Sequence, residues 1–197
     1  MAVIALIVYL VWAVLAFGWR TVVQHRRTGD SGLRLHAEVG SPQFWAKIGF
    51  VIALLVGLIG PIAAVTGLDN LQALDAGWIQ RVGVVVALIG VALTVLAQAS
   101  MADSWRIGVD PAERTALVMH GAFAIVRNPI FSAMLVTAAG LTLIVPNVIS
   151  VLGLIALIVA LEVQVRLVEE PYLRAVHGDE YRSYAGRVGR FVPGFRR

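Results

Sequence analysis

Two apolar runs in the C-terminal half decide the fold. Residues 130–163 read IFSAMLVTAAGLTLIV, then PN, then VISVLGLIALIVALEV. A spanning helix needs about 20 apolar residues, so each run alone is short, and the Pro-Asn dipeptide between them is typical of a turn. The stretch therefore predicts a helical hairpin, formed by residues 130–145 and 148–163, that packs against other membrane helices.

Three longer apolar runs precede the hairpin, and each is long enough to cross a bilayer. They are residues 2–19, 44–66 and 78–99. The first run lacks the positive start and the cleavage site of a signal peptide, so we expect it to remain as a helix. The sequence thus predicts an all-α membrane protein of about five transmembrane helices with a cytoplasmic C-terminal tail of short helices. We expect one domain, residues 1–197, with three helices in residues 1–99 and the hairpin and tail in residues 100–197.

The composition agrees with a membrane protein. Of the 197 residues, 59% are hydrophobic and 14% are charged, whereas soluble domains have about 45–50% apolar and about 25% charged residues. The absence of cysteine excludes disulfides, zinc–thiolate sites and cysteine nucleophiles. The formal charge of +4 does not indicate nucleic-acid binding, because the arginines lie between or after the apolar runs rather than in one patch.

The loops differ in charge, and this difference predicts the orientation. The loop after the first run is basic, the loop after the second has Asp69 and Asp75, and the segment after the hairpin is rich in arginine. Basic loops tend to stay in the cytoplasm. We therefore expect an integral protein of the plasma (inner) membrane with its N-terminus outside. The first loop, the loop 100–128 and the C-terminal tail then meet on the cytoplasmic face, where we expect the chemistry.

A charged cluster follows the second run of the hairpin. Glu162, Arg166 and either Glu169 or Glu170 are spaced by three and four residues, which places them on one face of a helix. The cluster is either a solvated helix end with internal ion pairs or a functional site, because ionisable groups at membrane depth usually pair or line a cavity. Pro171 disfavours helical geometry at Glu170, so we expect the helix to stop or kink there and leave the carboxylates at its end.

Two further polar segments flank the hairpin. In the first, Asn128 suits a helix N-cap and Pro129 suits the first helical position. Arg127 beside them either reaches lipid headgroups or adds to the attraction that a helix N-terminus exerts on anions. In the second, Tyr181 and Tyr184 share a helix face, which is typical of an amphipathic segment at the membrane surface.

The order of these segments resembles that of the membrane methyltransferases of the isoprenylcysteine carboxyl methyltransferase and phospholipid N-methyltransferase group. That family typically shows L-V-x-x-G-x-Y-x-x-x-R-H-P-x-Y, a helical hairpin, an E-E pair and G-x-E-Y-x-x-Y-x-x-R-V-x-R-x-x-P. The resemblance covers roughly residues 100–195, about half of the chain. The matching residues are Leu117, Val118, Gly121, Phe123, Arg127, Asn128, Pro129, Phe131, Glu169, Glu170, Gly178, Glu180, Tyr181, Tyr184, Arg187, Val188, Arg190 and Pro193.

The resemblance implies a cytoplasm-facing pocket for S-adenosylmethionine, walled by the two hairpin helices and capped by the tail. Asn128 and Phe131 stand where the family usually has histidine and often has tyrosine. The substrate-binding arginine of the prenyl enzyme falls by spacing on Val165, next to Arg166. The implied cofactor-binding residues are Thr115, Ala116, Leu117, Val118, His120, Phe123, Arg127, Asn128, Pro129, Phe131 and Glu169.

The implied reaction is methyl transfer from S-adenosylmethionine to a lipophilic acceptor. The acceptor is either the carboxylate of a prenylated or isoprenoid-like molecule, which needs no base, or a lipid amine, which needs one. Arg166 and Glu170 are the expected catalytic residues, with Arg166 at the acceptor and Glu170, or Glu162, as the base. The expected partners are the membrane and a lipophilic or lipid substrate, without nucleic acid or metal.

Two other classes stay open at this point. Membrane sterol reductases, which use NADPH, share a similar C-terminal half with an R-H-P-like turn, but they are usually much longer. A non-enzymatic membrane subunit is the other alternative. A transporter is disfavoured because the sequence has no internal repeat.

Overall fold

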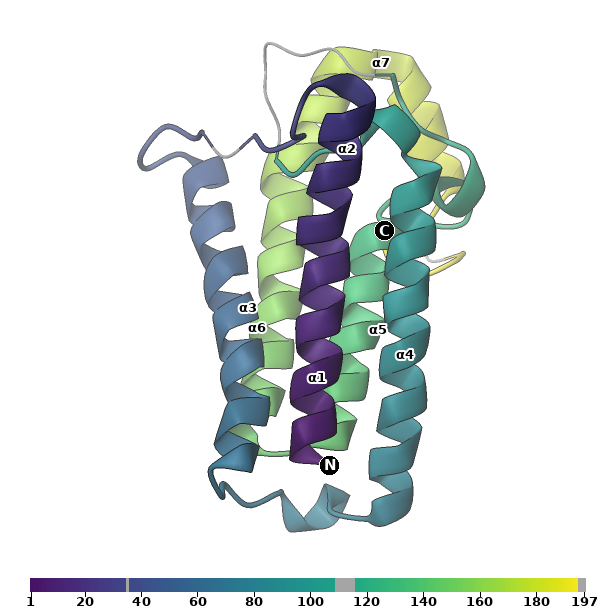
Figure 1. Ribbon diagram of the computed structural model, residues 1–197. Coiled ribbons are helices and arrows are strands. Elements are labelled where there is room, and N and C mark those ends of the chain that lie inside the picture. The colour runs from purple at the N-terminus through teal and green to yellow at the C-terminus, as the bar shows by residue number, and fades with distance from the viewer. Residues whose placement is uncertain (35, 109–115, 195–197) are drawn as a thin grey trace.

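The protein is a bundle of membrane-length helices (Figure 1). The computed structural model describes residues 1–34, 36–108 and 116–194. Within these residues, four helices are long and apolar enough to cross a bilayer, and another apolar helix is shorter. The four are Ala2–Thr28, Pro42–Val65, Gly77–Ser100 and Val148–Arg187, and the shorter one is Pro129–Ile144. The expectation of an all-α integral membrane protein with about five such helices is confirmed.

The first helix is longer than its apolar run predicts. It consists of α1 (Ala2–Ala13), the π-helical turn η1 (Val14–Trp19) and α2 (Arg20–Thr28), without a break. The helix continues past the apolar residues because polar side chains of α2 find partners in the loops, as Arg20 does at the carbonyl of Ala102. Gly29, with a φ of 76°, ends it in the left-handed conformation.

The second and third long helices begin and end within two residues of the predicted runs. They are α3 (Pro42–Val65) and α4 (Gly77–Ser100), joined by a loop that contains the 3-10 turn η2 (Gln72–Leu74). The hydroxyl of Ser41 caps α3 by accepting a hydrogen bond from the N–H of Phe44 at 3.1 Å. The loop after α4 contains the 3-10 turns η3 (Ala102–Ser104) and η4 (Gly121–Ala124).

The predicted hairpin is present as α5 (Pro129–Ile144) and α6 (Val148–Gln164). Asn147 is fully buried in its turn. The side-chain oxygen of Asn147 accepts from the N–H of Ser150 at 2.9 Å, and its amide group donates to the carbonyl of Gly60 at 3.0 Å. The hairpin is open rather than self-contained, because α5 packs mainly on α4 and α6 mainly on α3.

Small residues allow these pairs of helices to approach closely. A Cβ atom placed on Gly83 of α4 would lie 2.7 Å from the backbone nitrogen of Ile144. A Cβ atom on Gly153 of α6 would lie 3.0 Å from the backbone of Gly57 on α3. The lower half of the bundle in Figure 1 is therefore held by near-contact between helix backbones.

The helix that follows the hairpin does not end where the sequence predicts. α6 continues through a second π-helical turn, η5 (Val165–Glu169), into α7 (Glu170–Arg187). The wider turn accommodates Pro171, which has no N–H for an α-helical hydrogen bond and whose ring would crowd the preceding turn. Of the two expected outcomes at Glu170, a stop is wrong, and the irregularity is a π-helical turn that ends at Glu169. The chain bends later, at Gly178, which has a φ of 51° and a ψ of −121°.

The polar segments meet at one end of the bundle, as expected. Leu33 pairs with Ile107 through parallel backbone hydrogen bonds, and Val126 pairs in the same way with Gly189. These two bridges join the first loop, the loop between α4 and α5, and the segment after α7. In Figure 1 these segments lie in the upper part of the bundle, away from the N-terminus.

Candidate active site

A cavity of about 570 Å³ lies at the loop end of the bundle. This volume falls in the range of small-molecule sites. Part of its wall is apolar and comes from membrane helices, with Phe17 on η1, Phe50 and Leu54 on α3, and Met134 on α5. The charged residues of its wall are Lys47, Arg106, Arg127, Glu169 and Glu170. The cavity therefore joins a charged region to an apolar one.

Glu170 lies at the centre of an arginine cluster, and only 4% of its side chain is exposed. Arg190 donates hydrogen bonds of 2.7 and 3.1 Å to the two carboxylate oxygens, and Arg174 donates one of 3.1 Å. The guanidinium of Arg127 lies 3.3 Å away. A buried carboxylate with three guanidinium partners has its lone pairs engaged. This geometry favours a positioning role for Glu170 over the expected role as a base.

The same cluster joins the C-terminal segment to the start of α5. The backbone N–H of Arg127 donates to the carbonyl of Gly189 at 2.8 Å, and that of Asn128 donates to the carbonyl of Arg190 at 3.0 Å. Asn128 is the N-cap of α5 and Pro129 its first residue, as predicted. The side chain of Asn128 makes no capping hydrogen bond and instead donates to the carbonyl of Arg190 at 3.2 Å. The hydrogen bonds to Glu170 raise the pKa of Arg190, which keeps this link charged.

Tyr181 and Tyr184 share one face of α7, as their spacing predicts, and that face lines the cavity. Both side chains are buried, and their rings pack edge to face with centroids 6.2 Å apart. The hydroxyl of Tyr184 donates to the carbonyl of Phe123 at 2.6 Å. Burial against the loop removes two large rings from solvent and satisfies this hydroxyl.

The π-helical turn η5 separates residues that the sequence places on one helix face. One extra residue in the turn rotates the rest of the helix by about 100°. The amide group of Gln164 donates to the carboxylate of Glu169 at 3.2 Å, a contact across five positions, and Glu169 lines the cavity. Arg166 instead pairs with Glu162 away from the cavity wall, and 56% of its side chain is exposed. The predicted pairing of Glu162 with Arg166 is confirmed, but Arg166 does not share the cavity face with Glu169 and Glu170.

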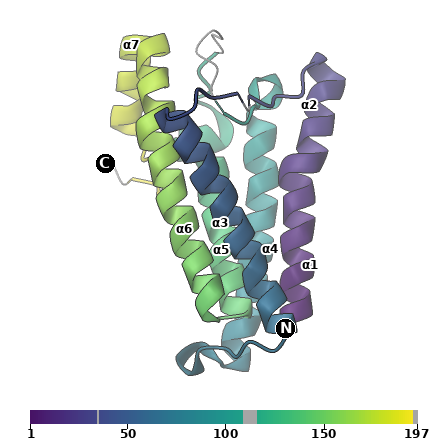
Figure 2. The same cartoon turned by 90° about the vertical axis from the view of Figure 1, so that its left-hand side faces the viewer.

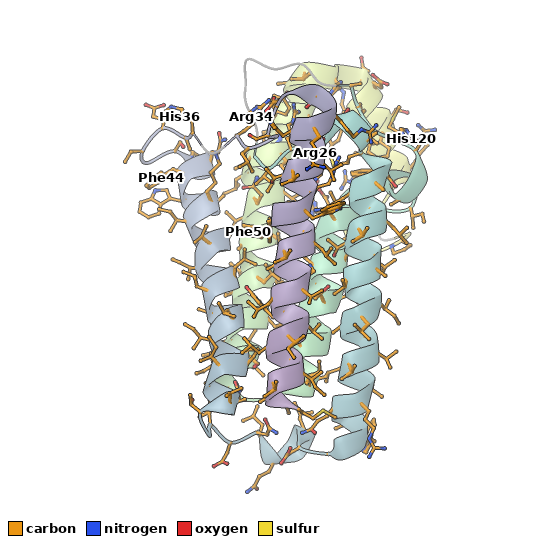
Figure 3. The ribbon with its side chains drawn as sticks, in the orientation of Figure 1. Arg26, Arg34, His36, Phe44, Phe50 and His120 are labelled. Carbon is orange, nitrogen blue, oxygen red and sulfur yellow. The ribbon has the colours of Figure 1, made fainter. Side chains whose placement is uncertain are left out.

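Most residues that the resemblance implies for the cofactor lie together on the cavity wall. They are Ala116, Leu117, Val118, Phe123, Arg127, Asn128, Pro129, Phe131 and Glu169. His120 is exposed and does not belong to the wall, and in Figure 3 it lies at the outer edge of the loop region. Thr115 falls outside the described residues.

Sequence reasoning missed several polar and aromatic residues of the cavity wall. Arg106 lies over the ring of Tyr172, 5.8 Å from its centroid, and both line the cavity. The sequence offered one signal for them, namely a polar residue within a predicted membrane span. Burying such a residue in the bilayer costs free energy, so it usually has a role. Two of the missed residues carried it, since Lys47 and Gln98 lie inside predicted spans. The missed residues include Lys47, Gln98, Trp105, Arg106 and Tyr172.

The charged part of the cavity fits a cofactor that bears a sulfonium and an amino-acid group. The carboxylate of Glu169 accepts a hydrogen bond from Gln164 and, among the described residues, has no lysine or arginine at salt-bridge distance. Such a carboxylate attracts a cationic ligand group. Arg127 offers the opposite charge for a ligand carboxylate.

Comparisons with known proteins agree with this geometry. The family model described as Phospholipid methyltransferase matches residues 78–180, which is just over half of the chain and covers α4, the hairpin, η5 and the first part of α7. Protein-S-isoprenylcysteine O-methyltransferase B of Arabidopsis thaliana is 26% identical over 146 residues, which cover 73% of this chain and 73% of that protein. The chain therefore belongs to the phospholipid methyltransferase family and is an integral membrane methyltransferase of that kind.

Proposed function

We propose that this protein transfers a methyl group from S-adenosylmethionine to a lipophilic acceptor that reaches the site from the membrane. The observation that carries the proposal is the composition of the cavity wall, where charged residues of the loop end adjoin apolar faces of the membrane helices. A polar cofactor and an apolar acceptor each find a matching wall in one chamber. Family membership and the likeness to an isoprenylcysteine O-methyltransferase support the proposal.

The proposal includes an orientation in the membrane. The cofactor is a polar molecule of the cytosol, so the loop end faces the cytoplasm, with the N-terminus outside and the C-terminus inside the plasma membrane. The basic residues of the first loop and of the C-terminal segment support this orientation, as do Asp69 and Asp75 at the opposite end of the bundle.

The residues have separate roles toward the cofactor. S-adenosylmethionine, when bound, supplies a methyl group that is electrophilic because it is attached to a sulfonium. Glu169 attracts the cationic part of the cofactor, and Arg127, held by Glu170, faces the carboxylate of its amino-acid group. Residues 116–118 and Phe123 form the apolar wall beside them. Thr115 belongs to the same proposed set by its position in the family motif.

The chain contributes to the reaction chiefly by positioning. An in-line methyl transfer requires the acceptor atom, the methyl carbon and the sulfur to be aligned, and alignment in a preformed cavity lowers the barrier. A carboxylate acceptor needs no base. For an amine acceptor, Glu169 is better placed than Glu170 to take the proton, because Glu170 is engaged by three arginines. Arg166 has no contact with the acceptor in this proposal.

The test is a thermal-denaturation titration of the detergent-solubilised protein. S-adenosylhomocysteine should raise the melting temperature in a saturable way, by the equivalent of about 2.7 kcal/mol at one hundred times its Kd. NADPH should have no effect. Glu169→Gln should remove the response, and the control Glu162→Gln, which changes a carboxylate away from the cavity, should retain it. Stabilisation by NADPH in place of S-adenosylhomocysteine would move the protein to the reductase class.

A further inference from the structure

Two cations of the cavity wall, Lys47 and Arg106, lie outside the arginine cluster, and Arg106 lies over the ring of Tyr172. Lys47 lies on α3 and lines the cavity. Its ammonium group donates to the carbonyls of Arg34 and His36, at 2.6 and 2.8 Å. In the part of the chain that the structure describes, no carboxylate lies at salt-bridge distance from it. An ammonium has three donors, so these two carbonyls orient Lys47 without neutralising it and leave one donor over.

The same face of α3 becomes apolar deeper in the bundle. Phe50, Val51 and Leu54 follow Lys47 by three, four and seven residues, and all of them line the cavity. With a rise of 1.5 Å per residue, Leu54 lies about 10 Å from Lys47 along the helix. Phe17 of η1 packs edge to face on Phe50, with ring centroids 6.4 Å apart, and extends the apolar wall to the first helix.

Figure 3 shows the same gradient, with Phe50 well below the loop that carries Arg34 and His36. The combination of a fixed cation and an adjacent apolar face matches an amphiphile with an acidic head group. The cation that the sequence assigned to the acceptor, Arg166, lies away from the wall. Arg127 is assigned above to the carboxylate of the cofactor, and Arg106 lies over the ring of Tyr172. Lys47 therefore supplies the charge for an acidic group at the top of the α3 face.

We propose that Lys47 binds the acidic head group of a carboxylate-bearing acceptor, whose hydrocarbon chain lies along Phe50, Val51 and Leu54. This inference rests on the methyl transfer proposed above. An oxygen of the acceptor carboxylate forms a bond to the methyl carbon as the bond between that carbon and sulfur breaks. The carboxylate becomes a neutral ester, the sulfonium becomes a neutral thioether, and no proton moves. Lys47 thus holds the anionic substrate and has less hold on the neutral product.

The test compares two ligands of the same size that differ only in the head group, an anionic carboxylate against a neutral carboxamide. Binding of N-acetyl-S-farnesylcysteine and of its carboxamide is measured by calorimetry on the detergent-solubilised protein saturated with S-adenosylhomocysteine. We expect the wild type to bind the acid about tenfold more tightly than the amide, the size of one hydrogen bond to a charged group. Lys47→Met and Lys47→Gln should abolish the preference, and Lys47→Arg should retain most of it. The glutamine variant keeps an amide donor for the loop carbonyls, so it still tests the inference if the methionine variant fails to fold.

A matched control separates head-group binding from loop anchoring. Asp30 accepts a hydrogen bond from the N–H of Gly32 and pairs with Arg34, but it does not line the cavity. Asp30→Asn loosens the loop that Lys47 holds, and it should keep the tenfold preference. Equal affinity of the wild type for both ligands, binding of neither, or a preference that survives in both neutral Lys47 variants would overturn the inference. Failure of S-adenosylhomocysteine to bind the wild type would instead contradict the proposed function.

Discussion

The two halves of the bundle are held together in different ways. In the membrane half, α4 and α5 approach until their backbones nearly touch at Gly83, and a cavity beside Tyr9 measures about 30 Å³. In the loop half, α1 and α3 diverge, as Figure 2 shows, and the cavity measures about 570 Å³. Backbone bridges and the cluster around Glu170 hold that half. Hydrogen bonds and ion pairs can hold the loop half together around a cavity large enough for a ligand. Close packing of helix backbones leaves no such space in the membrane half.

The largest effect is expected at Glu170, because one side chain anchors several parts of the loop half. Glu170→Gln removes the charge that pairs with Arg127, Arg174 and Arg190. Removing one partner of a buried ion pair lowers the free energy of unfolding by about 3–5 kcal/mol, because the other charge stays buried without compensation. We expect a clear fall in melting temperature and loss of S-adenosylhomocysteine binding, with the helical content from circular dichroism retained by the membrane half.

The control is a carboxylate of the same helix that lies away from the cavity. Glu162 is 37% exposed at its side chain, pairs with the exposed Arg166 and lies 3.9 Å from Arg190, which keeps its shorter hydrogen bond of 2.7 Å to Glu170. An exposed pair contributes about 0–1 kcal/mol, so Glu162→Gln should melt close to the wild type. Equal melting temperatures for the two variants would show that the arginine cluster does not hold the loop half.

A smaller loss of stability is expected in the membrane half. The methyl group of Gly83→Ala would meet the backbone nitrogen of Ile144 at 2.7 Å and the carbonyl oxygen of Gly140 at 2.8 Å. Overpacking of this kind typically costs about 1–3 kcal/mol. Gly49→Ala on α3 is the matched control, because no heavy atom lies within 4 Å of its Cβ position. Thermal unfolding should show a lower melting temperature for Gly83→Ala and an unchanged one for Gly49→Ala. The affinity of the folded protein for S-adenosylhomocysteine should change little in either variant.

The smallest effect concerns pH and the first loop. The hydrogen bond from Arg34, followed by that from the N–H of Gly32, holds the pKa of Asp30 below its usual range. A carboxyl whose pKa is lower in the folded state stabilises the fold at any pH above its pKa in the unfolded state, about 3.9 for aspartate. This stabilisation is lost as the pH falls through the pKa of the folded state. We expect a small, constant difference in melting temperature between the wild type and Asp30→Asn from about pH 8 to about pH 5. The difference should shrink below about pH 4, and a change between about pH 8 and about pH 6 would contradict the assignment.

The sequence predicts the membrane half well because one physical rule governs it. Length and apolarity place α3 and α4 within two residues, and Asn147 marks the turn of the hairpin. Charge patterning also predicts that the polar loops gather at one end. The motif residues Phe123, Phe131 and Glu169 lie on a common cavity wall.

The loop half is less predictable because it depends on single departures from regular geometry. The π turn before Glu170 cannot be read from a spacing of three and four, so Arg166 is assigned to the wrong side. The roles of Asn128 and Tyr184 depend on partners more than 60 residues away, at Arg190 and Phe123. No local pattern encodes such contacts. Lys47 carries a local signal, a cation inside an apolar run, but its carbonyl partners come from tertiary structure.

The bridge between Val126 and Gly189 also has a consequence for the order of assembly. Asn128 and Arg190, which this bridge brings together, are 62 residues apart in the chain. At a synthesis rate of about 5–20 residues per second, the ribosome takes roughly 3–12 s to make the residues between them. Arg127 lacks Glu170 for about the first two thirds of that interval and lacks the C-terminal segment throughout it, although α1, α3 and α4 are already made. The membrane half can therefore pack first, and the large cavity closes as one of the last events in the biogenesis of the protein.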